Sequence, residues 1–180
     1  MRDDSTARSF NDSTQLPRTL ALPPTATQGP GTADYQKVTM DGVILTCWYG
    51  SLSNEALETW QRLIDEQYEK AGGPIGLVMC VRESSTPPEG EFRRQAAKVM
   101  FSDKVGLISI VFEGSGFRAA IVRSVIAMIF TLGGRLSTPH KITDDPRLCA
   151  RWFADKTAKE TWSPDAGDVQ QVLEAMMHSS

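Results

Sequence analysis

Histidine and cysteine are scarce in this chain of 180 residues, which contains two histidines and three cysteines. The thiols of Cys47, Cys80 and Cys149 stand in apolar stretches and lack the CxxC spacing of a zinc or redox site. We therefore expect reduced thiols in the core, with no disulfide. His140 and His178 are distant in sequence and provide neither a catalytic triad nor a metal-ligand spacing. The sequence thus predicts no catalytic residues, no metal site and no cofactor.

Neither sign of charge dominates the chain, and no long apolar run occurs in it. The 19 Lys and Arg residues nearly balance 22 Asp and Glu residues, so that no clustered basic surface offers itself to nucleic acid or to acidic lipids. The main apolar stretch, residues 125–132, is far shorter than the roughly 20 residues that cross a bilayer. The start of the chain, MRDDSTARSFNDS, is acidic where a signal peptide is apolar. We therefore expect a cytoplasmic protein without a membrane span.

The first 34 residues differ in composition from the rest of the chain. They mix Ser, Thr, Asp and Pro without a sustained apolar period, which is typical of a disordered segment that buries little surface. We expect a flexible tail over residues 1–34, whose apolar cluster at residues 16–22 is either solvated or docked on a partner or on the domain. With 41% hydrophobic residues the chain can build one core. We place it in an α/β domain over residues 35–158, followed by a C-terminal helical extension over residues 159–180.

Apolar periodicity and turn signals define the elements of this domain. Asp41 and Gly42 separate two β-rich runs, a strong signal for a two-residue hairpin between antiparallel strands. Ser53 is placed to cap a helix whose apolar residues recur at helical spacing as far as Gly72. Asp145, followed by proline, begins a later helix. The other expected elements are strands over residues 75–81 and 105–112, a short edge strand within residues 135–141, and helices after Pro88, over residues 117–132 and over residues 168–178.

The expected helix over residues 117–132 is apolar around nearly its whole circumference. Two arrangements would cover such a helix. It is either deeply buried within one subunit, which we favour because central helices of small α/β domains are often apolar all round, or part of a contact between two copies.

The order strand, strand, helix, strand, helix, strand, helix, short strand, helix ends in a segment with Ala150, Arg151, Trp152 and Phe153. Over about residues 35–156 this pattern resembles the SpoIIAA-like branch of the STAS superfamily, in which the last strand runs through an acidic cap into an Ala-x-Trp-Leu-like helix. The resemblance implies a mixed sheet of four to five strands with packed helices, and we expect Trp152 to be buried. It also implies protein–protein regulation or the holding of an apolar ligand.

Anti-sigma-factor antagonists of this superfamily carry a phosphorylatable serine where a central strand meets the following helix. The matching residues here are Ser84, Ser85 and Thr86, in a loop that lacks the Asp-Ser-Gly signature and continues into Pro87 and Pro88. A phosphate there would lie near a helix N-terminus, which favours an anion. These side chains are regulatory candidates, and ordinary loop and capping residues are the alternative.

Two further groups are candidates for contact with an anion or a partner. Arg93 and Arg94 follow the loop closely enough in sequence to pair with a phosphate, or they form a solvated helix face. A glycine-rich turn precedes the apolar helix and either opens its N–H groups toward an anion or is a plain tight turn. That turn consists of Gly114, Ser115 and Gly116, with Arg118 after it as the anion partner.

These observations favour a non-enzymatic regulatory or scaffold protein, with a role in signalling, that acts through protein–protein contacts. The contact surface would comprise residues 84–91 and the apolar helix, and the partner would be another protein or a second copy in a homodimer. The alternative is a carrier of an apolar small molecule or lipid, as the related CRAL-TRIO-like architecture suggests. Its cavity between sheet and helices would be lined by Trp48, Trp60, Met79 and Phe112. An enzyme ranks last because the polar side chains it needs are not visible.

Overall fold

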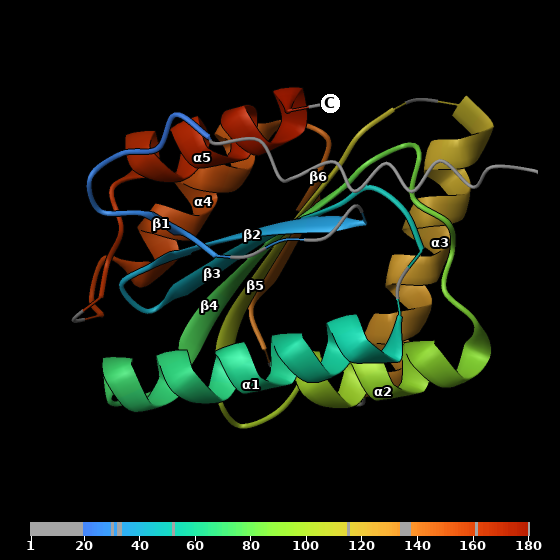
Figure 1. The fold of residues 1–180 in the computed structure, drawn as a ribbon, viewed down its shortest axis with the longest axis horizontal. Coiled ribbons are helices and arrows are strands. Elements are labelled where there is room, and N and C mark those ends of the chain that lie inside the picture. The colour runs from blue at the N-terminus through green and yellow to red at the C-terminus, as the bar shows by residue number, and fades with distance from the viewer. Residues whose placement is uncertain are drawn as a thin grey trace, which may run out of the picture.

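The computed structural model describes residues 20–29, 31, 34–51, 53–114, 116–133, 138–160 and 162–179, with residues 116–119, 122 and 133 described by their backbone alone. Strands and helices alternate along most of the chain and form one sheet with helices on both faces (Figure 1). The elements are β1 (Thr27–Gln28), β2 (Tyr35–Met40), β3 (Val43–Trp48), α1 (Asn54–Ala71), β4 (Ile75–Val81), α2 (Gly90–Met100), β5 (Val105–Phe112), α3 (Gly116–Gly133), β6 (His140–Thr143), α4 (Pro146–Thr157) and α5 (Ala166–His178).

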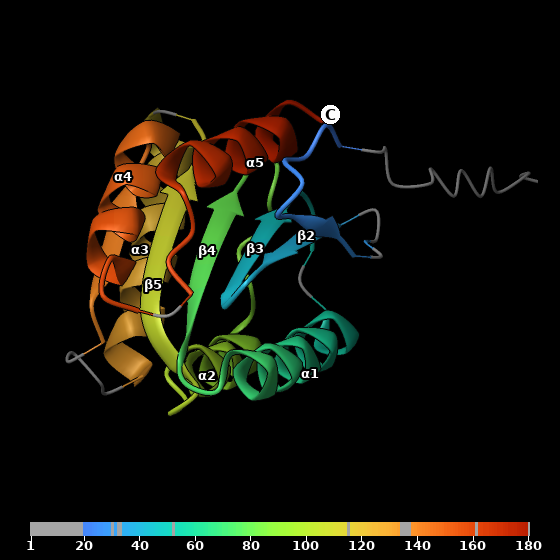
Figure 2. The same ribbon diagram turned by 90° about the vertical axis from the view of Figure 1, so that its left-hand side faces the viewer.

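The six strands lie side by side in the order in which they occur in the chain. Strands β1, β2 and β3 pair antiparallel, and β3, β4, β5 and β6 pair parallel. Each of the three connections between parallel strands contains one helix. Because these crossovers have the same handedness and link neighbouring strands in order, α1, α2 and α3 lie on the same face of the sheet. Helices α4 and α5 cover the opposite face (Figure 2). The sheet is therefore the middle of three layers.

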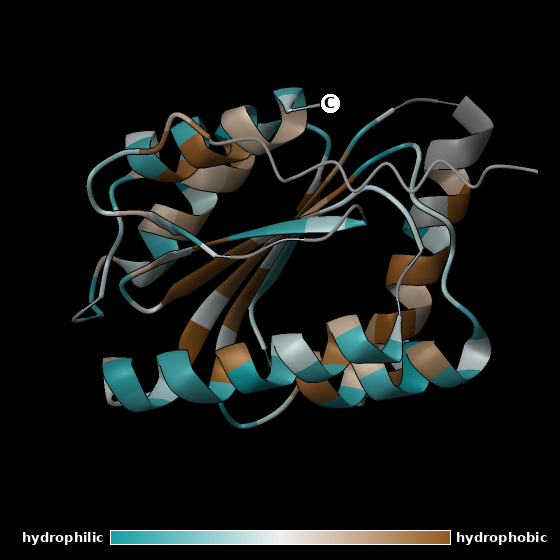
Figure 3. Ribbon diagram, viewed as in Figure 1, coloured by the Kyte–Doolittle hydropathy of each residue, from teal (hydrophilic) through white to brown (hydrophobic). Residues whose placement is uncertain are grey.

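Side chains of the central strands alternate between two cores. In β4, Leu77 and Met79 point to the first core, between the sheet and α1–α3, whereas Val78 and Cys80 point to the second core, between the sheet and α4–α5. Because both faces are covered, β3, β4 and β5 are apolar along most of their length (Figure 3). The three cysteines are free and buried, which confirms their predicted place in the core.

The local signals in the sequence are confirmed. Asp41 and Gly42 form the two-residue turn between β2 and β3, and Gly42 has the positive φ of 67° that such turns assign to glycine. The Ser53 hydroxyl accepts an N–H of the first turn of α1, and Gly72 ends this helix in the left-handed conformation. The Asp145 carboxylate caps α4, with proline at its first position. An edge strand is also present, as β6, but it begins later than the range 135–141 in which we expected it.

The sheet has six strands, whereas we expected four to five. The additional strand, β1, lies in the segment that we expected to be a flexible tail. It pairs with β2, and Leu20 nearby is only 9% exposed and packs in the second core. The Thr25 hydroxyl also donates to a carboxylate oxygen of Asp168, at 2.7 Å. Residues 20–29 therefore lie against the domain, because their few apolar side chains complete the second core, and residues 1–19 are outside the described part.

The C-terminal helix α5 belongs to the same domain, although we expected an extension over residues 159–180. Its inner face is completely buried in the second core and packs on α4 and β3. In α4, Phe153 is fully buried, whereas Trp152, which we expected to be buried, is only partly so. Phe153 fits against the sheet at Gly76, where an added Cβ would lie 2.2 Å from the ring atom Cζ. The buried residues of α5 are Val169, Val172, Leu173 and Met176.

Helix α3 is not buried all round in its described residues. Ile126, Ile129 and Phe130 point into the first core, but Met128 is 42% exposed and Leu132 is 48% exposed. The expectation of deep burial is therefore wrong for this half of the helix, because no described element covers its outer side. Among the described helices, none is both long enough and apolar enough to cross a membrane.

Candidate functional site

An apolar pocket lies on the α1–α3 side of the sheet, at the carboxyl ends of β3, β4 and β5. This is the end of a parallel sheet at which α/β proteins generally bind their ligands. The space open to the centre of a water molecule measures about 80 Å³. The lining residues come from the three strands, from helices α1, α2 and α3, and from the loop after β4: Trp48, Trp60, Met79, Val81, Ser85, Thr86, Pro87, Pro88, Phe92, Ala96, Met100, Ile110, Val125, Ile126, Ile129 and Phe130.

Two tryptophans form one wall of this pocket. Trp48 is the last residue of β3, and Trp60 lies on the inner face of α1; each is 5% exposed. Their rings meet edge to face, with centroids 6.0 Å apart and planes at 78°. Tyr35 also packs on Trp48, with ring centroids 5.1 Å apart. This aromatic stack fixes the wall, because neither indole can rotate without moving a neighbour.

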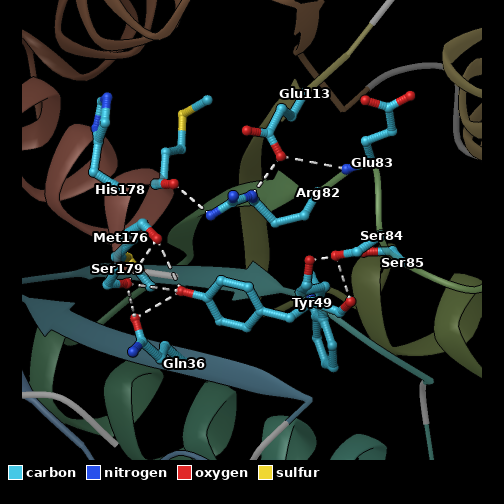
Figure 4. A network of polar contacts seen from close by, with 12 residues as sticks. Gln36, Tyr49, Arg82, Glu83, Ser84, Ser85, Glu113, Met176, His178 and Ser179 are labelled. Atoms are coloured by element: carbon cyan, nitrogen blue, oxygen red, sulfur yellow. Dashed lines mark hydrogen bonds and ion pairs between the residues drawn. The ribbon is translucent and has the colours of Figure 1, made fainter.

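The two serines of the loop after β4 attach this loop to the end of β3. The Ser84 hydroxyl donates to the backbone oxygen of Tyr49, and the Ser85 hydroxyl donates to that of Trp48, both at 2.7 Å (Figure 4). Ser84 is exposed and Ser85 is half-buried at the mouth of the pocket. The serines predicted as regulatory sites thus shape the entrance, and a phosphate on either oxygen would remove its bond to β3.

The rest of the loop is held by backbone and arginine contacts. The Thr86 N–H donates to the oxygen of Gly50 at 3.3 Å, and the Thr86 side chain is exposed at the pocket mouth. Arg93 donates through Nη1 to the oxygen of Pro88 at 3.1 Å. Arg94 pairs in an exposed position with Glu91 of its own helix, at 2.7 Å. Of the two arginines predicted to meet an anion, Arg93 therefore supports the mouth loop and Arg94 lies on a solvated helix face.

A second polar group, centred on Arg82, joins this loop to the C-terminal helix. The Arg82 guanidinium pairs with Glu113 through Nε and donates through Nη1 to the backbone oxygen of Met177 (Figure 4). Burial lowers the pKa of Arg82, but its hydrogen bond to Glu113 and the charge of this carboxylate outweigh burial, and the pKa is raised. Arg82 thus caps the end of α5 and remains charged.

Tyr49 is a further link to α5. Its hydroxyl lies 2.8 Å from both Gln36 Oε1 and the backbone oxygen of Met176, and 3.1 Å from Ser179 Oγ (Figure 4). Burial raises the pKa of Tyr49 far above its ordinary value. The phenol is therefore neutral and serves as a hydrogen-bonding anchor. The Arg82 and Tyr49 contacts were not found by sequence reasoning, since residues 36, 49, 82, 113 and 177 share no local pattern.

A carboxylate lies against the described part of the glycine-rich turn. Gly114 has a φ of 95°, and the Glu83 carboxylate packs so closely that a Cβ at Gly114 would lie 3.0 Å from its Oε2. Glu113, next to Gly114 in sequence, pairs with the Arg82 guanidinium. Gly116 is the first residue of α3. Ser115 and the side chain of Arg118 are outside the described part of the chain.

Three of the four residues that we expected to line a cavity do line the pocket, namely Trp48, Trp60 and Met79. The fourth, Phe112, is buried in the first core, where the Arg123 guanidinium lies 5.2 Å from its ring centroid. Sequence reasoning missed the contribution of α3, which forms the opposite wall. The signal was present in the apolar run of residues 125–132, but periodicity alone does not show which surface a helix covers.

Comparison with protein-family models, with curated proteins and with solved structures finds no match for this chain. Within the described residues, no three His, Cys, Asp or Glu side chains gather as they would around a metal ion. The pocket and the loop at its mouth are therefore interpreted from their own residues and contacts.

Proposed function

We propose that this protein is a non-enzymatic binding module that holds a small apolar molecule in the pocket between the sheet and helices α1–α3. The observation that carries the proposal is the pocket itself. Its walls are aromatic, aliphatic and thioether side chains, and its entrance is the loop after β4, which hydrogen bonds hold in place. None of its described lining residues ionises near neutral pH. Such a lining favours binding by burial of apolar surface over acid–base chemistry.

The size of the pocket restricts the ligand. An engineered apolar cavity of about 150 Å³ accepts benzene, and the space here is about 80 Å³. The pocket has about half that volume, so a single ring enters only when side chains move, and a lipid with two acyl chains is too large. Met79 and Met100 line the pocket, and their flexible side chains can widen it by rotamer changes. We infer a ligand with a body of about one ring or a short chain.

Toluene is a suitable first probe for this proposal. Titration should shift the ε-methyl NMR signals of Met79 and Met100, and it should leave the signal of Met176 in the second core unchanged. Replacement Ala96→Leu fills the pocket and should abolish the shifts, whereas Ala127→Leu on the exposed side of α3 should preserve them. Toluene shifts that persist in the Ala96→Leu protein, or no shifts in the wild type, would reject the proposal.

A second function, contact with another copy of this chain, is favoured by the exposed apolar side of α3. Met128 and Leu132 lie on the outside of the helix whose inner side lines the pocket, and the resemblance to STAS proteins implies regulatory contacts of this kind. Light scattering at micromolar concentration should show a dimer that the double replacement Met128→Lys and Leu132→Lys dissociates. A monomeric wild type would exclude this function.

A further inference from the structure

The last turn of helix α5 is fastened to two residues next to the pocket entrance. Tyr49 follows β3 and Arg82 follows β4, and both side chains lie on the α5 side of the sheet, opposite the pocket (Figure 4). The Tyr49 hydroxyl donates to the backbone oxygen of Met176 at 2.8 Å, and Arg82 donates to that of Met177. The Arg82 guanidinium also lies 5.6 Å from the centroid of the Tyr49 ring. Both side chains therefore meet the same end of α5.

The backbones of these two residues hold the loop at the mouth of the pocket. The Tyr49 oxygen accepts the Ser84 hydroxyl at 2.7 Å, so Tyr49 contacts α5 through its side chain and the loop through its backbone. Arg82 begins the loop. Its N–H donates to the oxygen of Trp48, and its own oxygen accepts the N–H of Ser85, both at 3.0 Å. A shift of either side chain would therefore displace a group to which the loop is bonded.

The loop can open only at its Arg82 end. At the other end, Pro87 and Pro88 have fixed φ angles, and the Pro88 oxygen accepts Nη1 of Arg93 at 3.1 Å. Residues 82–86 contain no proline and are attached to residues 48–50 by hydrogen bonds. Because the pocket is smaller than a cavity that holds one ring, a ring-sized ligand enters only when part of the lining moves.

We infer that the end of α5 controls how fast a ligand enters and leaves the pocket, with Tyr49 and Arg82 as the positioning residues. The inference rests on the proposed function, since it concerns access to the same pocket. While both side chains hold α5, the loop stays bonded to residues 48–50 and the mouth is closed. When residues 176–179 detach, these bonds break more often and the loop opens, which accelerates ligand exchange. Helix α5 thus acts on the entrance from the opposite face of the sheet.

Replacement Tyr49→Phe tests the inference. It removes the hydroxyl that reaches α5 and leaves the backbone oxygen that holds Ser84. We expect toluene to exchange about five- to tenfold faster, the factor that corresponds to the loss of one hydrogen bond. Its Kd should change by less than about twofold, because entry and exit are accelerated together. The exchange rate is measured from the ε-methyl NMR signals of Met79 and Met100.

Two further variants separate this role from a general loosening of the fold. Val169→Ala is the matched control, because Val169 is fully buried in the same helix but lies about two turns before Met176. It should change the exchange rate by less than about twofold. In a Ser84→Ala protein the loop has already lost its bond to Tyr49. Adding Tyr49→Phe should then accelerate the exchange by less than about twofold.

The outcomes distinguish the inference from the binding function. If Tyr49→Phe leaves the exchange rate unchanged, or if Val169→Ala accelerates exchange equally, the inference is wrong, whereas toluene binding to the wild type still supports the pocket. If toluene does not shift the signals of Met79 and Met100 in the wild type, both fail. Should Tyr49→Phe not fold, Arg82→Lys replaces it, since lysine keeps the charge but lacks the forked guanidinium that reaches α5. An unchanged exchange rate in that protein would equally overturn the inference.

Discussion

The close approach of Phe153 to Gly76 gives the sharpest test of the packing between α4 and the sheet. An alanine Cβ at position 76 would lie 2.2, 3.0 and 3.2 Å from three atoms of the Phe153 ring, whereas carbon atoms in contact are normally about 3.5–4.0 Å apart. The ring is fully buried, so it has no free space in which to move. Overpacking of this kind costs about 1–3 kcal/mol.

A smaller effect of opposite sign accompanies any glycine-to-alanine change. Alanine restricts the unfolded chain and thereby stabilises a protein by about 0.4–1 kcal/mol where the backbone permits it. We therefore expect Gly76→Ala to lower the free energy of unfolding by about 1–2 kcal/mol net. Gly73→Ala is the matched control, because a Cβ at Gly73 meets no atom within 4 Å. It should be neutral or slightly stabilising.

Urea unfolding followed by circular dichroism measures both free energies. The double variant Gly76→Ala with Phe153→Leu should be more stable than the sum of the single effects by about 1–2 kcal/mol, because leucine lacks the ring atoms that meet the new methyl group. If Gly76→Ala is no more destabilising than Gly73→Ala, and the two changes are additive, Phe153 does not pack on the sheet at Gly76.

Three further predictions concern the termini and the thiols. Replacement Arg82→Met removes the contacts with Glu113 and α5 and should lower the free energy of unfolding by about 2–3 kcal/mol. The control is Arg62→Met, which removes an exposed ion pair of 4.0 Å and should change this free energy by less than about 0.5 kcal/mol. Deletion of residues 1–34 should lower the Tm by roughly 3–12 °C through loss of Leu20 and β1, and an unchanged Tm would contradict their packing. Burial raises the pKa of Cys149 from 9.0 to about 11, so iodoacetamide at pH 8 should leave it unmodified unless urea is added. The Cys149 thiol of the unfolded chain ionises at a lower pH than the buried thiol. The contribution of Cys149 to the free energy of unfolding is therefore complete below pH 9 and is lost as the pH rises through about 11.

Most of the secondary structure could be predicted because its signals are local. The Asp41 and Gly42 turn, the Ser53 cap and the Asp145 cap each depend on a few consecutive residues, and all three are present. The strand β1 could not be predicted in this way. Its two residues carry no β-rich pattern, and they pair only because β2 presents an open edge.

The candidate site was only partly predictable for a related reason. Trp48, Trp60 and Met79 could be expected in a cavity because they are large apolar residues on elements that face one another. Ser84 and Ser85 hold the loop to the backbone oxygens of Tyr49 and Trp48, which lie about 35 residues earlier in the chain, and no local pattern in the sequence marks these contacts.

The arrangement of strands in chain order has a consequence for the folding pathway. Each strand from β2 to β6 pairs with its immediate predecessor, so the sheet can grow by one connection at a time. The antiparallel pairing of β2 with β3 closes only a two-residue turn, whereas each parallel pairing joins residues about 30 positions apart and forms more slowly. The contact between Thr25 and Asp168 is different, since it joins residues 143 positions apart. We expect the N-terminal segment to dock last, after α5 has closed the second core, and to be the first part of the described chain to detach on unfolding.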